Sequence, residues 1–183
     1  MAFLDKDIER VYFSKEEIKE RVRSLGEEIT RDYQGKDLVV ISILKGGFVF
    51  AADLIREIDL PIELEFMRLS SYGSGTETSG SVKIVSDLDS DISGRHVLII
   101  EDILDTGVTL AYLRDHVLAA RNPASFKICA MFDKTERRIA DIRADYRGFN
   151  TPNEFIVGYG LDYAQKYRNL PYVGVLKPEI YNK

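Results

Sequence analysis

The chain has 183 residues, of which 45% are hydrophobic, and its 25 basic and 30 acidic side chains give a formal net charge of -5. This length supports one core, so we expect residues 1–183 to form a single domain. The negative charge opposes attraction to nucleic acid and to anionic membranes. Neither a membrane-spanning run nor a signal peptide fits the charged start MAFLDKDIER, so we expect a cytoplasmic protein without nucleic-acid or membrane partners.

A capping box marks the first predicted helix. Ser14 is followed three residues later by Glu17, and apolar side chains then recur at helical spacing. In such a box each residue's side chain accepts a hydrogen bond from the other's backbone N–H, which satisfies two donors at the helix start. We expect this helix to end at Gly35.

Three apolar runs predict buried strands, and the first of them is unbroken and rich in β-branched residues. They are Leu38–Leu44 (LVVISIL), His96–Ile100 (HVLII) and Phe126–Phe132 (FKICAMF). Cys129 lies in the last run, where we expect it to serve as a small core residue. Strands that are apolar throughout are typical of a parallel sheet covered on both faces.

Helical periodicity follows the first two of these runs. It extends over Gly46–Ile58, and a later helix carries four apolar side chains on one face, Leu110, Leu113, Val117 and Leu118. This alternation of strands and helices predicts an α/β fold with a central, mainly parallel sheet flanked by helices.

A polar segment separates the two strand–helix units. Residues Ser70–Asp87 are dense in Gly, Ser and Thr, and strand-like sequence flanks them. Polar segments of this length between regular elements are often binding loops or lids. We therefore expect a mobile hairpin or lid at residues 70–87.

The carboxyl ends of the strands are the expected place for chemistry. In open α/β sheets, ligands bind in the crevice outside these ends. The residues that follow Leu44, Ile100, Phe132 and Val157 are therefore the first candidates.

An acidic pair and a Gly/Thr loop follow the second apolar run. Glu101 and Asp102 come at its end, and the loop DTGVT (105–109) directly precedes a helix. A helix amino terminus offers unpaired N–H groups and the positive end of the helix dipole, which suits a monophosphate. Carboxylates suit ribose hydroxyls or hydrated Mg²⁺. The substrate implied is a phosphorylated sugar with a metal.

Each of these residues taken alone has an ordinary structural explanation. Asp105 or Thr106 can simply cap the helix, Gly107 can form a turn, and acidic residues end many strands. Several other site patterns do not fit, because the sequence contains no G-x-x-x-x-G-K-[ST], no G-x-G-x-x-G after a strand and no G-x-S-x-G.

The whole run VLIIEDILDTGVTL (97–110) resembles the phosphoribosyl pyrophosphate motif of the type I phosphoribosyltransferases. The resemblance implies the fold of that family, in which a small hood and a flexible catalytic loop accompany the central sheet. The residues that it assigns to the phosphorylated ribose are Glu101, Asp102, Asp105, Thr106, Gly107, Val108 and Thr109. Asp105 is also placed to act as the general base toward purine N7.

Other segments are similar to the hypoxanthine-guanine branch of that family. Leu44-Lys45-Gly46-Gly47 resembles its pyrophosphate loop, whose leading peptide bond is often cis. This assigns Lys45 and Gly46 to pyrophosphate, with Arg168 as a further contact. The start of the flexible catalytic loop resembles four residues here, Ser70, Ser71, Tyr72 and Gly73. Closure of such a loop excludes water from the reaction.

Two further segments resemble the purine-binding elements of that branch. Lys134 follows the third apolar run, and the segment FIVGYGLD (155–162) comes about twenty residues later. The resemblance assigns Lys134 to the purine 6-oxo group, Phe155 to stacking on the ring and Ile156 to backbone contacts, with Asp162 near the base. The hood would be formed mainly by residues 134–183, with a contribution from the amino terminus.

Mg²⁺ is the cofactor that the resemblance implies, and three carboxylates are assigned to it, Glu101, Asp102 and Asp162. The implied activity joins hypoxanthine, and guanine, to the ribose of phosphoribosyl pyrophosphate, and the implied assembly is a homo-oligomer, a dimer or a tetramer. Two alternatives stay open. An RNA-binding attenuation regulator could keep the same fold, although the acidic charge opposes it, and a pyrophosphokinase-like or ligand-sensing relative would need an ATP site that the sequence does not show.

Overall fold

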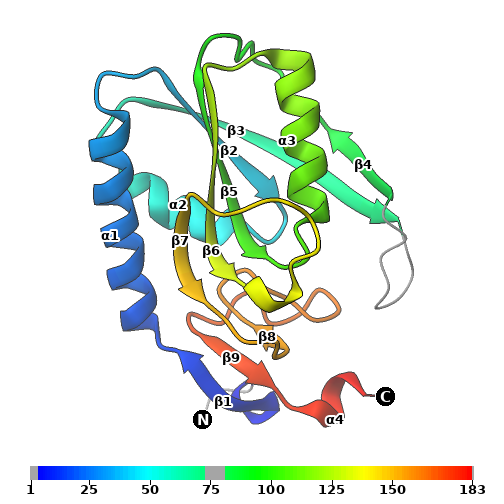
Figure 1. Cartoon of the computed structure of the whole chain (residues 1–183). Coiled ribbons are helices and arrows are strands. Elements are labelled where there is room, and N and C mark those ends of the chain that lie inside the picture. The colour runs from blue at the N-terminus through cyan, green and yellow to red at the C-terminus, as the bar shows by residue number, and fades with distance from the viewer. Residues whose placement is uncertain (1–3, 73–80, 183) are drawn as a thin grey trace.

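A six-stranded sheet forms the centre of the computed structural model, which describes residues 4–72 and 81–182 (Figure 1). Its strands lie in the order β4-β3-β2-β5-β6-β7. Their bounds are β2 (Leu38–Leu44), β3 (Ile62–Tyr72), β4 (Ser81–Ser86), β5 (His96–Leu104), β6 (Ser125–Asp133) and β7 (Tyr146–Asn150). All neighbouring strands are parallel except β3 and β4, so the predicted α/β fold with a mainly parallel sheet is confirmed.

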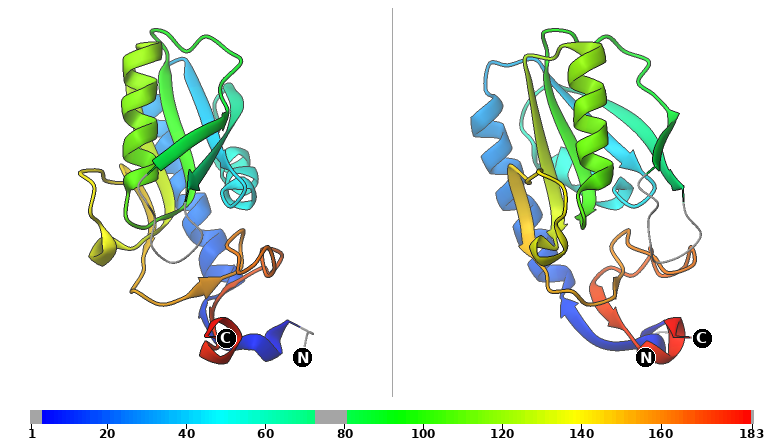
Figure 2. Two further views of the ribbon diagram at one scale, coloured as in Figure 1. Left: turned by 90° about the vertical axis from the view of Figure 1, so that its right-hand side faces the viewer. Right: turned by 45° about the vertical axis from the view of Figure 1, so that its right-hand side comes forward.

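Helices cover both faces of this sheet (Figure 2). They are α1 (Lys15–Tyr33), α2 (Phe48–Glu57) and α3 (Val108–Arg121). Helices α1 and α2 pack against Leu98 and Cys129, whereas α3 packs against Val97 and Ile128 on the opposite face. Because neighbouring residues of a strand point to opposite faces, a sheet covered on both sides requires strands that are apolar throughout.

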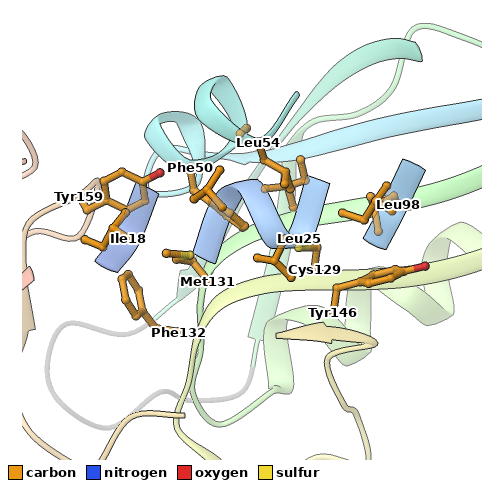
Figure 3. Packing of buried hydrophobic residues seen from close by; sticks show 14 of the residues in the cluster. Ile18, Leu25, Phe50, Leu54, Leu98, Cys129, Met131, Phe132, Tyr146 and Tyr159 are labelled. Carbon is orange, nitrogen blue, oxygen red and sulfur yellow. The ribbon is translucent and has the colours of Figure 1, made fainter. Parts of the chain in front are cut away.

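The core between the sheet and helices α1 and α2 contains the single cysteine (Figure 3). Cys129 is fully buried beside Leu25 and Leu98, which confirms its predicted core role. Burial raises the pKa of its thiol, so the neutral form prevails. The side chain therefore contributes to packing and not to catalysis.

Helix α1 begins at the predicted capping box. Ser14 Oγ accepts a hydrogen bond from Glu17 N at 3.2 Å, and Glu17 Oε2 accepts one from Ser14 N at 2.8 Å. The helix ends at Tyr33, slightly before the expected Gly35. Gly35 lies just beyond the end with φ +73°, in the left-handed region that favours glycine after a helix.

Strand β5 is longer than predicted. The sequence suggested that it ends at Ile100, but the strand continues to Leu104 and includes Glu101 and Asp102. The backbone explains the difference, because Glu101 pairs with Ala130 of β6 and the pairing continues to the end of both strands. Glu101 and Asp102 therefore lie within the strand and are fixed by its pairing with β6, whereas the pairing with β2 ends at Ile100.

Leu118 departs from the predicted apolar face of α3. Leu110, Leu113 and Val117 are buried, whereas Leu118 is 44% exposed. At 100° per residue, the eighth position after Leu110 has already rotated off the stripe that the other three residues form.

A small antiparallel sheet lies apart from the central one, with the order β1-β9-β8. Its strands are β1 (Ile8–Phe13), β9 (Val173–Leu176) and β8 (Ile156–Val157). The 3-10 helix η1 (Asp5–Asp7) and helix α4 (Pro178–Tyr181) lie beside it, near the two ends of the chain (Figure 1). Val157 pairs with Gly174 of β9 in this small sheet, so the expectation that it ends a strand of the central sheet is wrong.

Strands β3 and β4 form an antiparallel hairpin at one edge of the central sheet. Ser70 pairs with Lys83 and Tyr72 with Ser81, so the regular pairing reaches further toward the tip than the expected lid of residues 70–87 suggested. Gly73 lies outside the described residues. Within the described part of the chain, no helix is long and apolar enough to cross a membrane.

Candidate active site

The loop between β5 and α3 has the shape expected of a phosphate-binding turn. Gly107 has φ +84°, and α3 begins directly after it at Val108, with Thr109 in its first turn. A Cβ atom on Gly107 would lie 2.6 Å from Ile142 Cγ2, so no other residue fits without displacing its neighbours. Both constraints require glycine at this position, which directly precedes α3, where N–H groups are available to an anion.

Asp105 opens this loop and is held by residues from another segment. Its Oδ1 atom lies 3.1 Å from Arg137 Nε, without the alignment of a hydrogen bond. Arg138 Nε donates to the backbone carbonyl of Asp105 at 3.0 Å. Both arginines come from the turn η2 (Thr135–Arg137) and the residue after it. These two arginines were not predicted, because an Arg-Arg pair in a polar turn carries no distinctive pattern.

The acidic pair lies beside the turn that follows β2. Asp102 is only 8% exposed, and a Cβ atom on Gly46 would lie 1.7 Å from Asp102 Oδ2. Gly46 is therefore required for this close approach. Burial, and then the neighbouring Asp102 carboxylate, raise the pKa of Glu101 well above its usual value, and burial also raises the pKa of Asp102.

A third segment of the chain approaches the carboxyl ends of β2 and β5. A Cβ atom on Gly160, which has φ +99°, would lie 2.3 Å from the Gly46 carbonyl oxygen. Arg168 Nη1 donates to the Gly160 carbonyl at 2.7 Å, and Arg168 Nη2 lies 2.6 Å from Asp162 Oδ1. The positive charge of Arg168 also opposes the rise in the pKa of Asp102. Residues 160–168 thus form one wall of the site.

Lys45 and Arg168 converge on one oxygen atom. The Leu44–Lys45 peptide bond is cis, as the resemblance implied. Lys45 Nζ donates to Gln165 Oε1 at 3.2 Å, and Arg168 Nη2 donates to the same oxygen at 3.5 Å. Two cationic side chains from distant parts of the sequence therefore meet at a single acceptor. This arrangement suits a ligand with several negatively charged oxygens.

Lys134 lies on the other side of the phosphate loop. It is 7% exposed, and Lys134 Nζ donates to the Glu154 carbonyl at 2.7 Å. Burial lowers the pKa of this lysine, while the Asp105 carboxylate and Glu154 oppose that change. The Lys134 backbone N–H donates to the Leu104 carbonyl at 2.9 Å, so Lys134 and Asp105 follow different strands but lie close together in the fold. An ammonium held by one hydrogen bond keeps further donors for a ligand.

Phe155 and Ile156 differ in exposure although they are neighbours. Phe155 is 39% exposed and stacks on Tyr181 of α4, with ring centroids 4.9 Å apart. Tyr163 contacts it edge-on, with centroids 5.6 Å apart. Ile156 is 6% exposed and pairs with Val175 through its backbone. An exposed ring supported by two others can offer its free surface to a flat ligand.

The predicted metal residues can hold Mg²⁺ only together with oxygen atoms of water and of the substrate. The described part of the chain contains no group of three or more His, Cys, Asp or Glu side chains that could hold an ion by themselves. Asp162 is paired with Arg168, whereas Glu101 and Asp102 lie side by side with raised pKa values. Mg²⁺ commonly binds one or two carboxylates together with water and substrate oxygens, which suits this donor set.

The structure thus brings most predicted site residues to the carboxyl ends of the parallel strands. Lys45, Gly46, Asp102 and Arg168 lie together, and the Lys134 backbone bonds to Leu104, the residue before Asp105. The residues assigned to a catalytic loop are not part of this group in any described contact. Ser70, Ser71 and Tyr72 end β3, and Gly73 is outside the described residues, so this role stays a prediction.

The fold and the phosphate loop define a class of protein. The family model described as "Phosphoribosyl transferase domain" matches residues 12–164, which is most of the chain. This chain belongs to the phosphoribosyl transferase family.

Several similar proteins carry more specific names than the family. The chain is 56% identical to a hypoxanthine-guanine phosphoribosyltransferase of Streptococcus thermophilus, over 98% of this chain and 99% of that protein. It is 53% identical to a protein of the same name from Lactococcus lactis, over 98% of this chain and 97% of the other. A crystal structure of a hypoxanthine phosphoribosyltransferase from Staphylococcus aureus superposes with a TM-score of 0.95 at 48% identity, covering 100% of this chain and 98% of the other.

Proposed function

We propose that this protein transfers the 5-phosphoribosyl group from phosphoribosyl pyrophosphate to hypoxanthine and guanine, forming IMP and GMP with release of pyrophosphate. Purine salvage in the cytoplasm is the setting that fits this reaction. The observation that carries the proposal is the position of the donor Lys134, whose backbone N–H bonds to the Leu104 carbonyl, next to the base Asp105 at the start of a phosphate-binding loop. The names of the similar proteins support the same activity.

The phosphate loop binds the 5′-phosphate in this proposal. The free N–H groups at the start of α3 and the hydroxyls of Thr106 and Thr109 donate to the phosphate oxygens. Val108 contributes its backbone N–H, and Gly107 permits the close approach. Glu101 and Asp102 lie next along the strand, where they orient the ribose hydroxyls.

Lys45 and Arg168 neutralise the departing pyrophosphate. Both already donate to Gln165 Oε1, and a pyrophosphate oxygen would be a stronger, charged acceptor for the same groups. Gly46 contributes its backbone at the same turn. Breaking the bond to the ribose leaves positive charge on the sugar and negative charge on the leaving group, so cations fixed at the leaving group favour the reaction.

Asp105 and Lys134 act on the purine. As the purine nitrogen attacks the ribose, Asp105 accepts a proton from N7, and Lys134 donates a hydrogen bond to the 6-oxo group. Phe155 stacks on the ring, and the backbone around Ile156 contacts its edge. Because Lys134 is buried, a purine without a matching acceptor leaves its ammonium poorly satisfied.

The proposed cofactor is Mg²⁺, held by Glu101 and Asp102 on the ribose side and by Asp162 on the pyrophosphate side. When bound, the ion would offset the negative charge of the pyrophosphate. Asp162 would keep its pairing with Arg168 or exchange it for the ion. A homo-oligomer, a dimer or a tetramer, is the proposed assembly.

The proposal is tested by incubating the purified protein with phosphoribosyl pyrophosphate, Mg²⁺ and hypoxanthine or guanine. We expect IMP and GMP, each with one equivalent of pyrophosphate. A protein that forms neither nucleotide over several hours would refute the proposal. The same preparation tests the RNA-binding alternative, because an acidic chain should bind a structured RNA weakly and without preference at physiological salt.

A further inference from the structure

Arg138 is almost completely committed to backbone groups around the phosphate loop. Its three guanidinium nitrogens donate to the carbonyls of Asp105 at 3.0 Å, Leu104 at 3.2 Å and Ile142 at 3.0 Å. It also forms an ion pair with Asp133. The side chain is only 15% exposed. A planar guanidinium with five N–H donors can satisfy such a set of acceptors, whereas an ammonium cannot reach them all at once.

The ion pair with Asp133 fixes the orientation of this guanidinium. Asp133 is 4% exposed, and its Oδ2 atom lies 3.5 Å from Arg147 Nη1 on the far side. A buried carboxylate between two arginines has little freedom to rotate. The last residue of β6 thereby positions Arg138 against the last residues of β5.

Three successive carbonyls of the loop point toward the segment that carries Arg138. Besides the contacts from Arg138, the Leu104 carbonyl accepts from Lys134 N at 2.9 Å. The Thr106 carbonyl accepts from the backbone N–H groups of residues 139 and 140, at 3.0 and 3.1 Å. The carbonyls of residues 104, 105 and 106 are therefore all engaged on the same side of the chain.

The peptide geometry determines where the intervening N–H groups point. In a planar trans peptide, the N–H points away from the C=O of the same unit. Holding the carbonyls of residues 104–106 therefore turns the N–H groups of Asp105, Thr106 and Gly107 to the opposite side. None of these three N–H groups donates to another backbone group within the described part of the chain. They are left for a ligand at the amino terminus of α3.

We propose that Arg138 is a positioning residue for the phosphate loop, which holds the carbonyls of Leu104 and Asp105 so that the loop presents its N–H groups to the 5′-phosphate. This inference rests on the proposed function and adds a residue to it. Arg138 does not touch the substrate. It acts through the backbone of the loop, and it also holds the backbone of Asp105, the proposed base.

The inference is tested with Arg138→Lys and Arg138→Met, with Arg143→Met as the matched control. Arg143 is an exposed arginine that lines the same surface cavity of about 380 Å³ as Arg138. The first measurement is the Kd for ribose 5-phosphate by titration calorimetry. We expect both Arg138 variants to bind it about tenfold or more weakly, since one or both of the charge-assisted hydrogen bonds to the Leu104 and Asp105 carbonyls are lost, and Arg143→Met to bind it normally.

The steady-state constants separate positioning from general loss of structure. Arg138→Lys should raise the KM for phosphoribosyl pyrophosphate and lower kcat, for a fall in kcat/KM of roughly 10²-fold, while the KM for hypoxanthine changes less than about threefold. Guanidinium added to Arg138→Ala should restore activity, because the neighbouring cavity gives it access to the vacated space. The same addition should leave Arg143→Ala unchanged.

Three results would overturn the inference. They are normal ribose 5-phosphate affinity in Arg138→Lys, equal losses for both substrates that follow the melting temperature, and no response to guanidinium in a folded Arg138→Ala protein. If the unmodified protein bound ribose 5-phosphate but formed no nucleotide, the proposed reaction would fail. The affinity comparison among the variants would still decide the role of Arg138.

Discussion

The phosphate loop and the purine side of the site are built in different ways. The acidic pair and the loop form one continuous stretch, residues 101–109, between a central strand and a helix. The purine side instead combines Lys134 after β6, Phe155 before β8 and Tyr181 of α4. A contiguous motif concentrates the chemistry in a few neighbouring residues, whereas the purine side depends on tertiary contacts. Substitutions in the first region should therefore have larger and more specific effects.

Removal of divalent metal should have the largest effect of all. Glu101 and Asp102 lie side by side with raised pKa values, and a polyphosphate would bring more negative charge to them. Excess chelator should abolish nucleotide formation, and added Mg²⁺ should restore it. Full activity in excess chelator would show that the reaction needs no metal. Glu101 and Asp102 would then contact the ribose hydroxyls only.

Asp105→Asn should lower kcat by about 10²–10⁴-fold, because the amide cannot accept the proton from N7. The protein should remain folded, since the ion pair with Arg137 is partly exposed and contributes little to stability. Asp141→Asn is the matched control, an exposed carboxylate on the neighbouring turn. If Asp105→Asn turned over at the normal rate, another residue would have to serve as the base.

Two glycines with positive φ allow the loop geometry to be tested separately from backbone strain. Gly94→Ala changes a residue with φ +72° and no neighbouring atom within 4 Å, so we expect a loss of about 1 kcal/mol in the free energy of unfolding. Gly107→Ala has similar strain and in addition forces Ile142 aside. It should cost more stability and also raise the KM for phosphoribosyl pyrophosphate. Equal behaviour of the two variants in unfolding and kinetics would show that the close approach at Gly107 is unimportant.

The smallest effect is expected at the edge of the purine side. Arg10 of β1 donates to both Glu154 carboxylate oxygens, at 2.6 and 2.5 Å, and the Glu154 carbonyl holds Lys134. Both side chains of the ion pair are partly exposed to solvent, so Arg10→Met should leave the free energy of unfolding nearly unchanged. The kcat/KM for hypoxanthine should fall by no more than about threefold, since the Glu154 backbone is also held by the bond from its N–H to the Pro152 carbonyl at 2.8 Å. A larger kinetic loss would make this pair part of the purine site.

The sequence predicted the central sheet and the phosphate loop because their signals are local. Continuous apolar runs identified β2, β5 and β6, and the capping box identified the start of α1. The extension of β5 through Glu101 and Asp102 was not predicted, because two acidic residues usually mark a strand end, and only the pairing with β6 shows otherwise.

The remaining features depend on contacts between residues far apart in the chain. The small sheet joins β1 to β9, and no local pattern reveals that pairing. Arg138 is a similar case, since its role follows from three carbonyls and Asp133, which only the fold brings together. The purine residues were found through a family resemblance, and the geometry around Lys134 is the part that the structure added.

The most direct test of the account is the kcat/KM for hypoxanthine, guanine, xanthine and adenine with the same protein. The buried Lys134 ammonium is a donor only, so it matches a 6-oxo group and opposes the 6-amino group of adenine. We expect hypoxanthine and guanine to react, xanthine to trail hypoxanthine, and adenine to be poorer by a factor on the order of 10⁴. Lys134→Ala should narrow the gap between adenine and hypoxanthine, mainly by losing hypoxanthine. Adenine reacting as well as hypoxanthine in the unmodified protein would contradict the role of Lys134 and the proposed 6-oxopurine specificity.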